Sequence, residues 1–168
     1  NWLTLSAGNY FVVSVKTNGT LWSWGQNNFG QLGIGSTVYN SSPVQIGALT
    51  TWYKSSCGTA FARATTTSRA LYSWGFNSTG QLGNGNSTNY SSPKQIGALS
   101  TWNKISCGTI YSIATKTDGT LWSWGDNTYG QLGLGNTTLY SSPKQVGSVA
   151  TWGALPYTNF SATVLAQG

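Results

Sequence analysis

The chain repeats itself with a period of 50 residues. A tryptophan recurs at that spacing from Trp2 to Trp152, and so does the block Gly-Gln-Leu-Gly. Residues 20–47 match residues 120–147 at 18 of 28 positions. A self-similar period of this length is the signature of a repeat architecture. We therefore predict a single repeat domain over residues 1–168, consisting of the repeats 2–51, 52–101 and 102–151 and a partial fourth repeat, 152–168.

Each copy of the repeat is predicted to form four short β-strands. In the third copy, short apolar runs end at glycines, and Asp118 followed by Gly119 is typical of a tight hairpin turn. A long connection is predicted from Asp126 to Pro143, just before the last strand. The predicted strands of this copy are Trp102–Cys107, Ile110–Thr115, Thr120–Trp124 and Lys144–Val146. No helical periodicity is present, so the predicted class is all-β.

The third strand of each copy is apolar on both faces. Trp122 and Trp124 would face one side of the sheet, and Leu121 would face the other. Blades stacked around a ring cover both faces, because each blade packs on two neighbours. We therefore predict a β-propeller of four-stranded antiparallel blades, with Trp24, Trp74 and Trp124 packed between blades. A β-solenoid is the alternative, although solenoid repeats are usually shorter.

The long connection is predicted to be compact. Gly30 and Gly33 permit backbone angles that other residues avoid. The amides of Asn27 and Gln31 are suited to bonding the exposed backbone there. The Gly-Gln-Leu-Gly block is similar to a phosphate-binding loop only superficially, because neither a Lys-Ser or Lys-Thr pair nor a helix follows it.

Charged residues are scarce. They make up 6% of the chain, against roughly 25% in ordinary domains. The net charge of +6 reflects a lack of acidic residues rather than an abundance of bases. The bases lie singly along the chain, whereas a nucleic-acid-binding protein concentrates them in a patch. No apolar run approaches the roughly 20 residues that cross a bilayer. Composition therefore argues against a nucleic-acid partner and against a membrane span.

Few side chains of the chain are suited to acid–base catalysis. The sequence has neither His nor Glu, so only Asp118 and Asp126 are available for general acid–base work. Asp118 is accounted for by its hairpin. Asp126 stands where the other copies have Gln26 and Phe76, which indicates loop variation. No base lies beside a nucleophilic serine in any recognisable pattern. We predict that the chain is not an enzyme and has no catalytic residues.

The two cysteines occupy equivalent positions in neighbouring copies. Cys57 and Cys107 stand where the first copy has Ala7, and a position that accepts Ala or Cys is typically small and buried. Equivalent points on stacked sheets lie about 10 Å apart, which is too far for a disulfide. We therefore predict two structural thiols. Without His, and with two isolated Cys, we predict neither a metal site nor a cofactor.

The order of these motifs resembles one known family. Leu-Trp-Ser-Trp-Gly, then Asn, then Gly-Gln-Leu-Gly-x-Gly, then Ser-Pro, and finally a Trp and Cys-Gly are similar to the repeat of the regulator of chromosome condensation family. The resemblance covers the whole chain except its C-terminal end. It implies a seven-bladed propeller, a number that the spacing alone does not provide. The near-identical copies and the low charge are most similar to the prokaryotic and phage members.

The resemblance implies a binding function, because members share protein binding through loops at the propeller ends. The founding member is a nucleotide-exchange factor for a small GTPase and binds chromatin. This chain lacks the charged loops that such a factor would use, and a shared fold does not fix function. We therefore predict a non-catalytic protein-binding or structural module of an extracellular or virion-surface assembly. Its partner would be a protein or further copies of the chain, and exchange or chromatin binding is an alternative.

Residues of the long connections that fall outside the repeat pattern are the candidate binding residues. Carbohydrate stacking on exposed aromatic side chains is a further alternative, which would make the chain a lectin-like propeller with glycan partners. The candidates, all assigned to the long connections, are Phe29, Tyr39, Phe76, Tyr90, Asp126, Tyr129 and Tyr140.

Three and a third repeats cannot close a ring of seven. The chain opens on Asn1 without a methionine, and its fourth copy keeps only a remnant of the first strand and the apolar stretch 160–166. An open arc would leave apolar faces uncovered, which is rare in soluble monomers. We expect a fragment of a longer propeller, or an arc covered by copies of itself. We expect the 168-residue polypeptide made alone to aggregate, self-associate or stay partly unfolded, which sedimentation would test.

Overall fold

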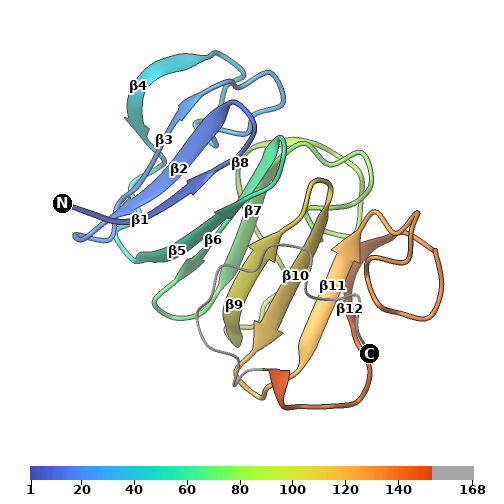
Figure 1. The fold of residues 1–168 in the computed structure, drawn as a ribbon. Coiled ribbons are helices and arrows are strands. Elements are labelled where there is room, and N and C mark those ends of the chain that lie inside the picture. The colour runs from blue at the N-terminus through green and yellow to red at the C-terminus, as the bar shows by residue number, and fades with distance from the viewer. Residues whose placement is uncertain (153–168) are drawn as a thin grey trace.

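The computed structural model describes residues 1–152, which form three four-stranded antiparallel sheets (Figure 1). The first sheet consists of β1 (Trp2–Ala7), β2 (Phe11–Lys16), β3 (Leu21–Gly25) and β4 (Asn40–Gln45). The second consists of β5 (Trp52–Cys57), β6 (Phe61–Thr66), β7 (Leu71–Gly75) and β8 (Tyr90–Gln95). The third consists of β9 (Trp102–Cys107), β10 (Tyr111–Lys116), β11 (Leu121–Gly125) and β12 (Tyr140–Gln145).

The predicted all-β chain of four-stranded antiparallel blades is confirmed. Within each sheet the strands pair in chain order, so each sheet is a simple meander and is one blade. The predicted first strand and the hairpin of the third copy are confirmed, with Gly119 at φ +83°. Apart from Trp152, the partial fourth repeat, with its apolar stretch 160–166, lies outside the described residues.

The predicted start of the fourth strand is wrong. We expected this strand to follow Pro143, but β12 begins at Tyr140 and runs through the proline. Proline has no N–H to donate, so within sheets it is confined to edge strands and bulges. Strand β12 is the edge strand of its blade, and Pro143 lies in the stretch where its register with β11 shifts. The second and third strands are each shifted by one residue from the prediction, to Tyr111–Lys116 and Leu121–Gly125.

The three blades follow one another along an arc, as Figure 1 shows. Strand β1 contacts β5, and β5 in turn contacts β9, so the first strands of the blades form the line along which the blades meet. The backbone N–H of Trp52 also donates to the carbonyl of Gly19, and that of Trp102 donates to the carbonyl of Arg69. These bonds tie the start of each blade to the hairpin of the blade before it.

Tryptophans packed between blades form the core, as predicted. Trp74 and Trp124 are fully buried. The indole Nε1 of Trp74 donates to the carbonyl of Gln31 in the preceding blade, at 2.9 Å. A Cβ at Gly33 would lie 2.7 Å from that nitrogen. Residue 33 therefore has to be glycine, because any side chain there would clash with the indole. Trp24, in the first blade, is only partly buried, because no described blade precedes it.

The two cysteines are free thiols within neighbouring blades, which confirms the prediction that they do not pair. Both are partly buried, and burial raises the pKa of each thiol above its ordinary value. The backbone N–H of Cys57 donates to the Ser6 hydroxyl, and that of Cys107 donates to the Ser56 hydroxyl. The cysteines therefore lie in the contacts between first strands, as structural residues.

The strand order gives each blade two different ends. One end carries the turn between strands one and two and the long connection between strands three and four; we call this end of the molecule the connection rim. The opposite end carries the hairpin between strands two and three and the link to the next blade; we call it the hairpin rim. The connection rim includes residues 26–39, 76–89 and 126–139, and the hairpin rim includes residues 17–20, 67–70 and 117–120.

Candidate functional site

Side-chain amides hold the long connections in one shape, as the sequence predicted. The amide oxygen of Asn27 accepts from the backbone N–H of Leu32, and its Nδ2 donates to the carbonyls of Ser36 and Val38. Each bond is 2.9 Å long. Asn77 and Asn127 make the corresponding bonds in the other blades, again at 2.8–3.0 Å. The connection rim is therefore a set of pre-shaped loops, which can present side chains at fixed positions.

Three tyrosines on the connection rim extend into solvent. Tyr10 is 72% exposed, Tyr39 is 58% exposed and Tyr129 is 91% exposed. Tyr10 and Tyr39 both adjoin Gln26, whose backbone N–H donates to the Tyr10 carbonyl at 2.8 Å and whose Nε2 lies 3.5 Å from the Tyr39 hydroxyl. Exposed tyrosines are typical of protein-binding surfaces because they bring large contact area with few rotatable bonds.

Tyr10 is absent from the candidates drawn from the sequence. It lies in the turn between β1 and β2, whereas the predicted candidates all belong to the long connections. The repeat alignment carried a usable signal, because Ala60 and Ile110 occupy the same place in the other copies. A large aromatic residue at a position that otherwise takes smaller apolar residues marks a local departure from the repeat.

Two of the predicted aromatic residues pack on each other. The rings of Phe29 and Phe76 are 4.6 Å apart between centroids and tilted by 48°. Phe29 belongs to the connection of the first blade and Phe76 to that of the second, so this pair joins neighbouring loops. Their mutual contact leaves less of both rings available to a partner than at the three exposed tyrosines.

Tyr90 and Tyr140 are not in the long connections, where we had placed them. They are the first residues of β8 and β12, because the fourth strands begin earlier than predicted. The Tyr90 hydroxyl accepts from Nδ2 of Asn86 at 3.0 Å, and the Tyr140 hydroxyl accepts from Nδ2 of Asn136 at 3.3 Å. Both tyrosines therefore fasten the end of a connection to the strand that follows it.

Asp126 is engaged within its own loop. Its carboxylate accepts from the Thr128 hydroxyl at 2.7 Å and from Nε2 of Gln131. In the first copy the equivalent Gln31 Nε2 donates instead to the Asn28 amide oxygen, and in the second copy Gln81 Nε2 has no partner among the described residues. The carboxylate is thus bound to its neighbours in the loop, in a structural arrangement.

Arg63 is a buried charge that the sequence reasoning missed. It projects from β6 between the second and third blades, is fully buried, and donates to the Gln81 carbonyl and the Ser112 hydroxyl. Its guanidinium carbon lies 4.4 Å from the centre of the Trp124 ring, a cation–π contact. Burial lowers the pKa of Arg63 to about 10, so it stays protonated at neutral pH. Its place between blades makes it a packing residue with no access to a surface partner.

Residues 1–152 bring no three His, Cys, Asp or Glu side chains close enough together to hold a metal ion. The same part of the chain has no helix with the length and apolar character that a membrane crossing requires. The connection rim, with its braced loops and exposed tyrosines, is the candidate site.

The fold is shared with several solved propellers. Prp20p from Saccharomyces cerevisiae is similar with a TM-score of 0.78 at 19% identity, over 88% of this chain and 39% of that one. Yeast RCC1 (Prp20) bound to Kap60 gives 0.77 at 19% identity, over 88% and 37%. Human WBSCR16 gives 0.54 at 17% identity, over 88% and 53%. The chain thus spans about two fifths of Prp20p, and these identities show the fold alone.

Family models match most of the chain. A model described as the regulator of chromosome condensation (RCC1) repeat matches residues 18–64, 70–115 and 118–154. A second model of the same description matches residues 3–31 and 102–131. A comparison with curated protein sequences gives no match. The first matched unit runs from the hairpin of one blade into β6 of the next, so it spans the contact between two blades. The chain therefore belongs to the regulator of chromosome condensation (RCC1) repeat family.

Proposed function

We propose that the chain is a non-catalytic protein-binding module that takes its partner at the connection rim. The observation that carries the proposal is the exposure of Tyr10, Tyr39 and Tyr129 on loops that side-chain amides hold in place. Rigid loops reduce the entropy lost on binding, and tyrosine is enriched among the residues that dominate interface energies. Propellers of this family are generally binding modules, which supports the same reading.

The partner and the location belong to the same proposal. The printed descriptions of the yeast relatives concern binding to Gsp1p, to histones and to Kap60, all of them proteins. The described surface of this chain is polar but nearly uncharged, since only 6% of its residues carry charge. We therefore place its partner on a weakly charged protein surface, in an extracellular or virion-surface assembly.

A photo-crosslinking residue on each rim tests this proposal. We would place p-benzoyl-phenylalanine at Tyr129 and, as a matched control, at Leu99, an exposed apolar residue of the link that leads to β9. The expected result is a protein adduct from position 129 that is absent or at least fivefold weaker from position 99. Adducts from position 99 alone would contradict the connection rim as the binding surface.

Nucleotide exchange and chromatin binding are the second candidate, on the strength of the fold that the chain shares with Prp20p. A nucleotide-release assay with a small GTPase from the source organism decides between the two. Accelerated release that the combined substitution of Tyr10, Tyr39 and Tyr129 by serine abolishes would favour exchange. Binding without accelerated release would favour the simple binding module.

A further inference from the structure

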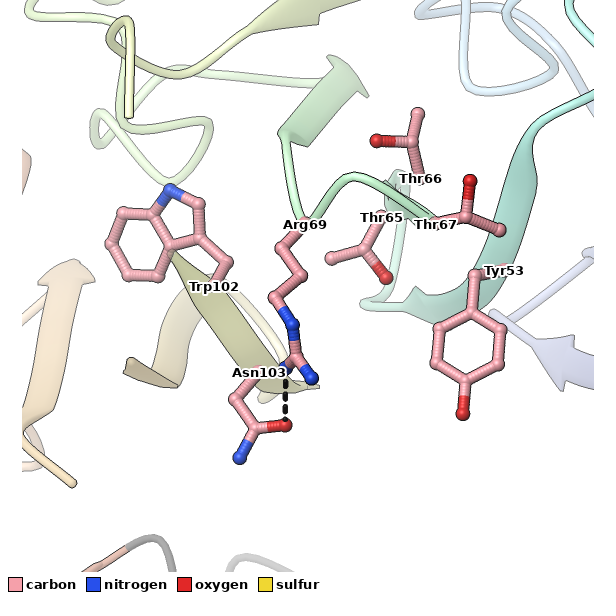
Figure 2. Close-up of a pocket in the computed structure, with 7 residues that line it drawn as sticks. All are labelled: Tyr53, Thr65, Thr66, Thr67, Arg69, Trp102 and Asn103. Carbon is pink, nitrogen blue, oxygen red and sulfur yellow. Dashed lines mark hydrogen bonds between the residues drawn. The ribbon is translucent and has the colours of Figure 1, made fainter. Parts of the chain in front are cut away.

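A small pocket opens on the hairpin rim between the second and third blades, away from the proposed binding surface. Its volume is about 200 Å³. That is below the roughly 300–1,000 Å³ of pockets that enclose whole cofactors, so it suits a single small functional group. The backbone N–H of Trp102 donates to the Arg69 carbonyl at 3.2 Å, which fixes the two blades around it. The pocket is lined by Tyr53, Thr65, Thr66, Thr67, Arg69, Trp102 and Asn103 (Figure 2).

The second blade places its hairpin cation differently from its neighbours. In the first and third blades the cation is Lys16 or Lys116, whose Nζ lies 3.7 or 3.6 Å from the centre of a Trp ring in its own blade. The second blade has Thr66 at that position. Its cation is instead Arg69, where the neighbouring hairpins have glycine. The hairpin cation of the second blade thus lies in the wall of the pocket, whereas those of the other two blades lie over a Trp ring.

Arg69 has a strained backbone. It is the one non-glycine residue with positive φ within residues 1–152, at +66°, a conformation that suits the glycines of the other hairpins. Such strain costs of order 1–3 kcal/mol and tends to gather at ligand clamps. An arginine at this position therefore has a cost that the hairpin turn itself does not require.

Within residues 1–152, no acidic side chain pairs with Arg69. The chain has two acidic residues, and both are bound elsewhere: Asp118 to Thr120 in its own hairpin and Asp126 on the opposite rim. The hydrogen bond that Arg69 makes is with a neutral group, from its Nη1 to the Asn103 amide oxygen at 3.0 Å. In Figure 2 this pair forms one side of the pocket and Tyr53 forms the other.

One further polar group at the pocket lacks a partner. The Thr65 hydroxyl is buried without a hydrogen bond among the described residues. In the third blade the hydroxyl equivalent to Thr65, that of Thr115, accepts from the backbone N–H of Lys104. Buried polar groups usually have partners. Figure 2 shows the Thr65 hydroxyl between Arg69 and Tyr53, at the back of the pocket.

We propose that this pocket binds a carboxylate. The planar guanidinium of Arg69 matches a carboxylate with two parallel hydrogen bonds, and the Thr65 hydroxyl supplies a further donor on the same side of the pocket. One cationic side chain balances one negative charge, which fits a carboxylate better than a phosphate dianion. The exposed ring of Tyr53 covers the apolar stem that carries the group. Two sources share this chemistry: a free small carboxylate, and an acidic side chain of a peptide.

Saturation-transfer difference NMR on the full-length protein tests the proposal with defined probes. These are acetate, the blocked peptide acetyl-Ala-Glu-Ala-amide and its Gln counterpart. We expect saturable binding of acetate and the Glu peptide, and none of the Gln peptide. Tenfold tighter binding of the Glu peptide than of acetate would identify a peptide side chain as the source, and similar affinities would identify a free carboxylate. No saturable binding, or equal binding of the Gln peptide, would overturn the proposal.

Three variants tie the binding to this pocket. Arg69→Gly restores the residue of the neighbouring hairpins and relieves the strained φ, so it should fold and lose at least about tenfold in affinity. Arg69→Lys keeps the positive charge but lacks the two parallel N–H donors of the guanidinium. Its affinity should lie between those of Arg69→Gly and the wild type. Lys94→Ala removes one positive charge from the exposed strand β8 and should bind as the wild type does. Unchanged affinity in Arg69→Gly, or displacement of the Glu peptide by phosphate at lower concentration than by acetate, would overturn the proposal.

Discussion

The first and second blades have closely similar sequences but very different surroundings. Trp52, at the start of the second blade, is 3% exposed, whereas the equivalent Trp2 of the first blade is 48% exposed. Trp74 is fully buried and bonded to the blade before it, while Trp24 is partly exposed. The same residue type on the same strand is therefore a core residue in one blade and a surface residue in the other. The difference shows that a blade is buried by its neighbour and not by its own sheet.

The last described blade, at the other end of the arc, shows the same difference between a covered and an uncovered position. A Cβ at Gly83 in the second blade would lie 2.4 Å from Nε1 of Trp124. A Cβ at Gly133 in the third blade would meet nothing closer than Val146, at 3.4 Å. Equivalent loops are thus tightly covered between blades and open at the last described blade.

The largest expected effect compares the two tryptophans. Trp74→Ala should lower the free energy of unfolding by about 3–5 kcal/mol, as truncation of a fully buried large aromatic residue does. Trp24→Ala should cost no more than about half of that, because its side chain is partly exposed in the described chain. Urea denaturation of both variants measures the difference. A loss below about 1 kcal/mol for Trp74→Ala would contradict its role between the blades.

The next comparison uses the two glycines. Gly83 and Gly133 both have positive φ, so an alanine at either position costs about 1 kcal/mol in backbone strain. At Gly83 the new methyl group would also displace the Trp124 ring, which adds about 1–3 kcal/mol. The melting temperature of Gly83→Ala should therefore be clearly lower than that of Gly133→Ala. Equal destabilisation would mean that another part of the protein covers the third blade.

Arg63 allows a test within the contact between the second and third blades. Its Nε and Nη1 are buried without partners, and the first and third blades have Val13 and Ile113 at the same position. Replacing buried charge with apolar groups of similar size is often neutral or stabilising. We expect Arg63→Ile to raise the free energy of unfolding by about 1 kcal/mol, since Ser112 still bonds the Gln81 carbonyl. A large loss of stability in urea would show that the guanidinium is an essential bridge.

The smallest expected effect compares two hairpins. Asp118 accepts from the backbone N–H and hydroxyl of Thr120, and Asn18 makes the same bonds to Thr20 in the first blade. These bonds hold the pKa of Asp118 below its ordinary value of 3.8. The associated stability is therefore present above pH 3.8 and is lost as the pH falls through the lowered pKa. Asp118→Asn should leave stability at pH 7 nearly unchanged and remove this acid-side dependence, which melting curves between pH 2 and pH 7 would reveal.

The fold could be predicted because residues with the same structural role recur in all three copies. The glycines of the long connection, the hairpin turn and the tryptophans before Gly75 and Gly125 all recur, and all lie where expected. The start of the fourth strand was predicted too late because Pro143 is usually a reason to interrupt a strand, and the sequence does not show that this strand lies at an edge.

The two arginines escaped prediction for a different reason. A prediction based on recurring residues omits residues that occur in one copy alone. Both Arg63 and Arg69 are of this kind, because the other copies have apolar residues or glycine at their positions. The sequence showed these departures, but it could not show that one side chain is buried between blades and the other lies at a pocket. The seven candidate residues of the long connections remain predictions, and exposure now favours Tyr39 and Tyr129 among them.

The bond from Trp74 to Gln31 has a consequence for how the protein is made. The acceptor loop is nearly the same in all three blades, so a newly formed blade meets several chemically equivalent loops, on its own chain and on others. The acceptor segments Gln31–Gly33 and Gln81–Gly83 have the same sequence, although the Gln81 carbonyl accepts from Arg63 and Ser112 instead of from a tryptophan. During synthesis the preceding blade emerges first and is the nearest loop, so order in time selects the correct pairing. Refolding from denaturant removes that order, and the yield of correctly paired blades then depends on protein concentration.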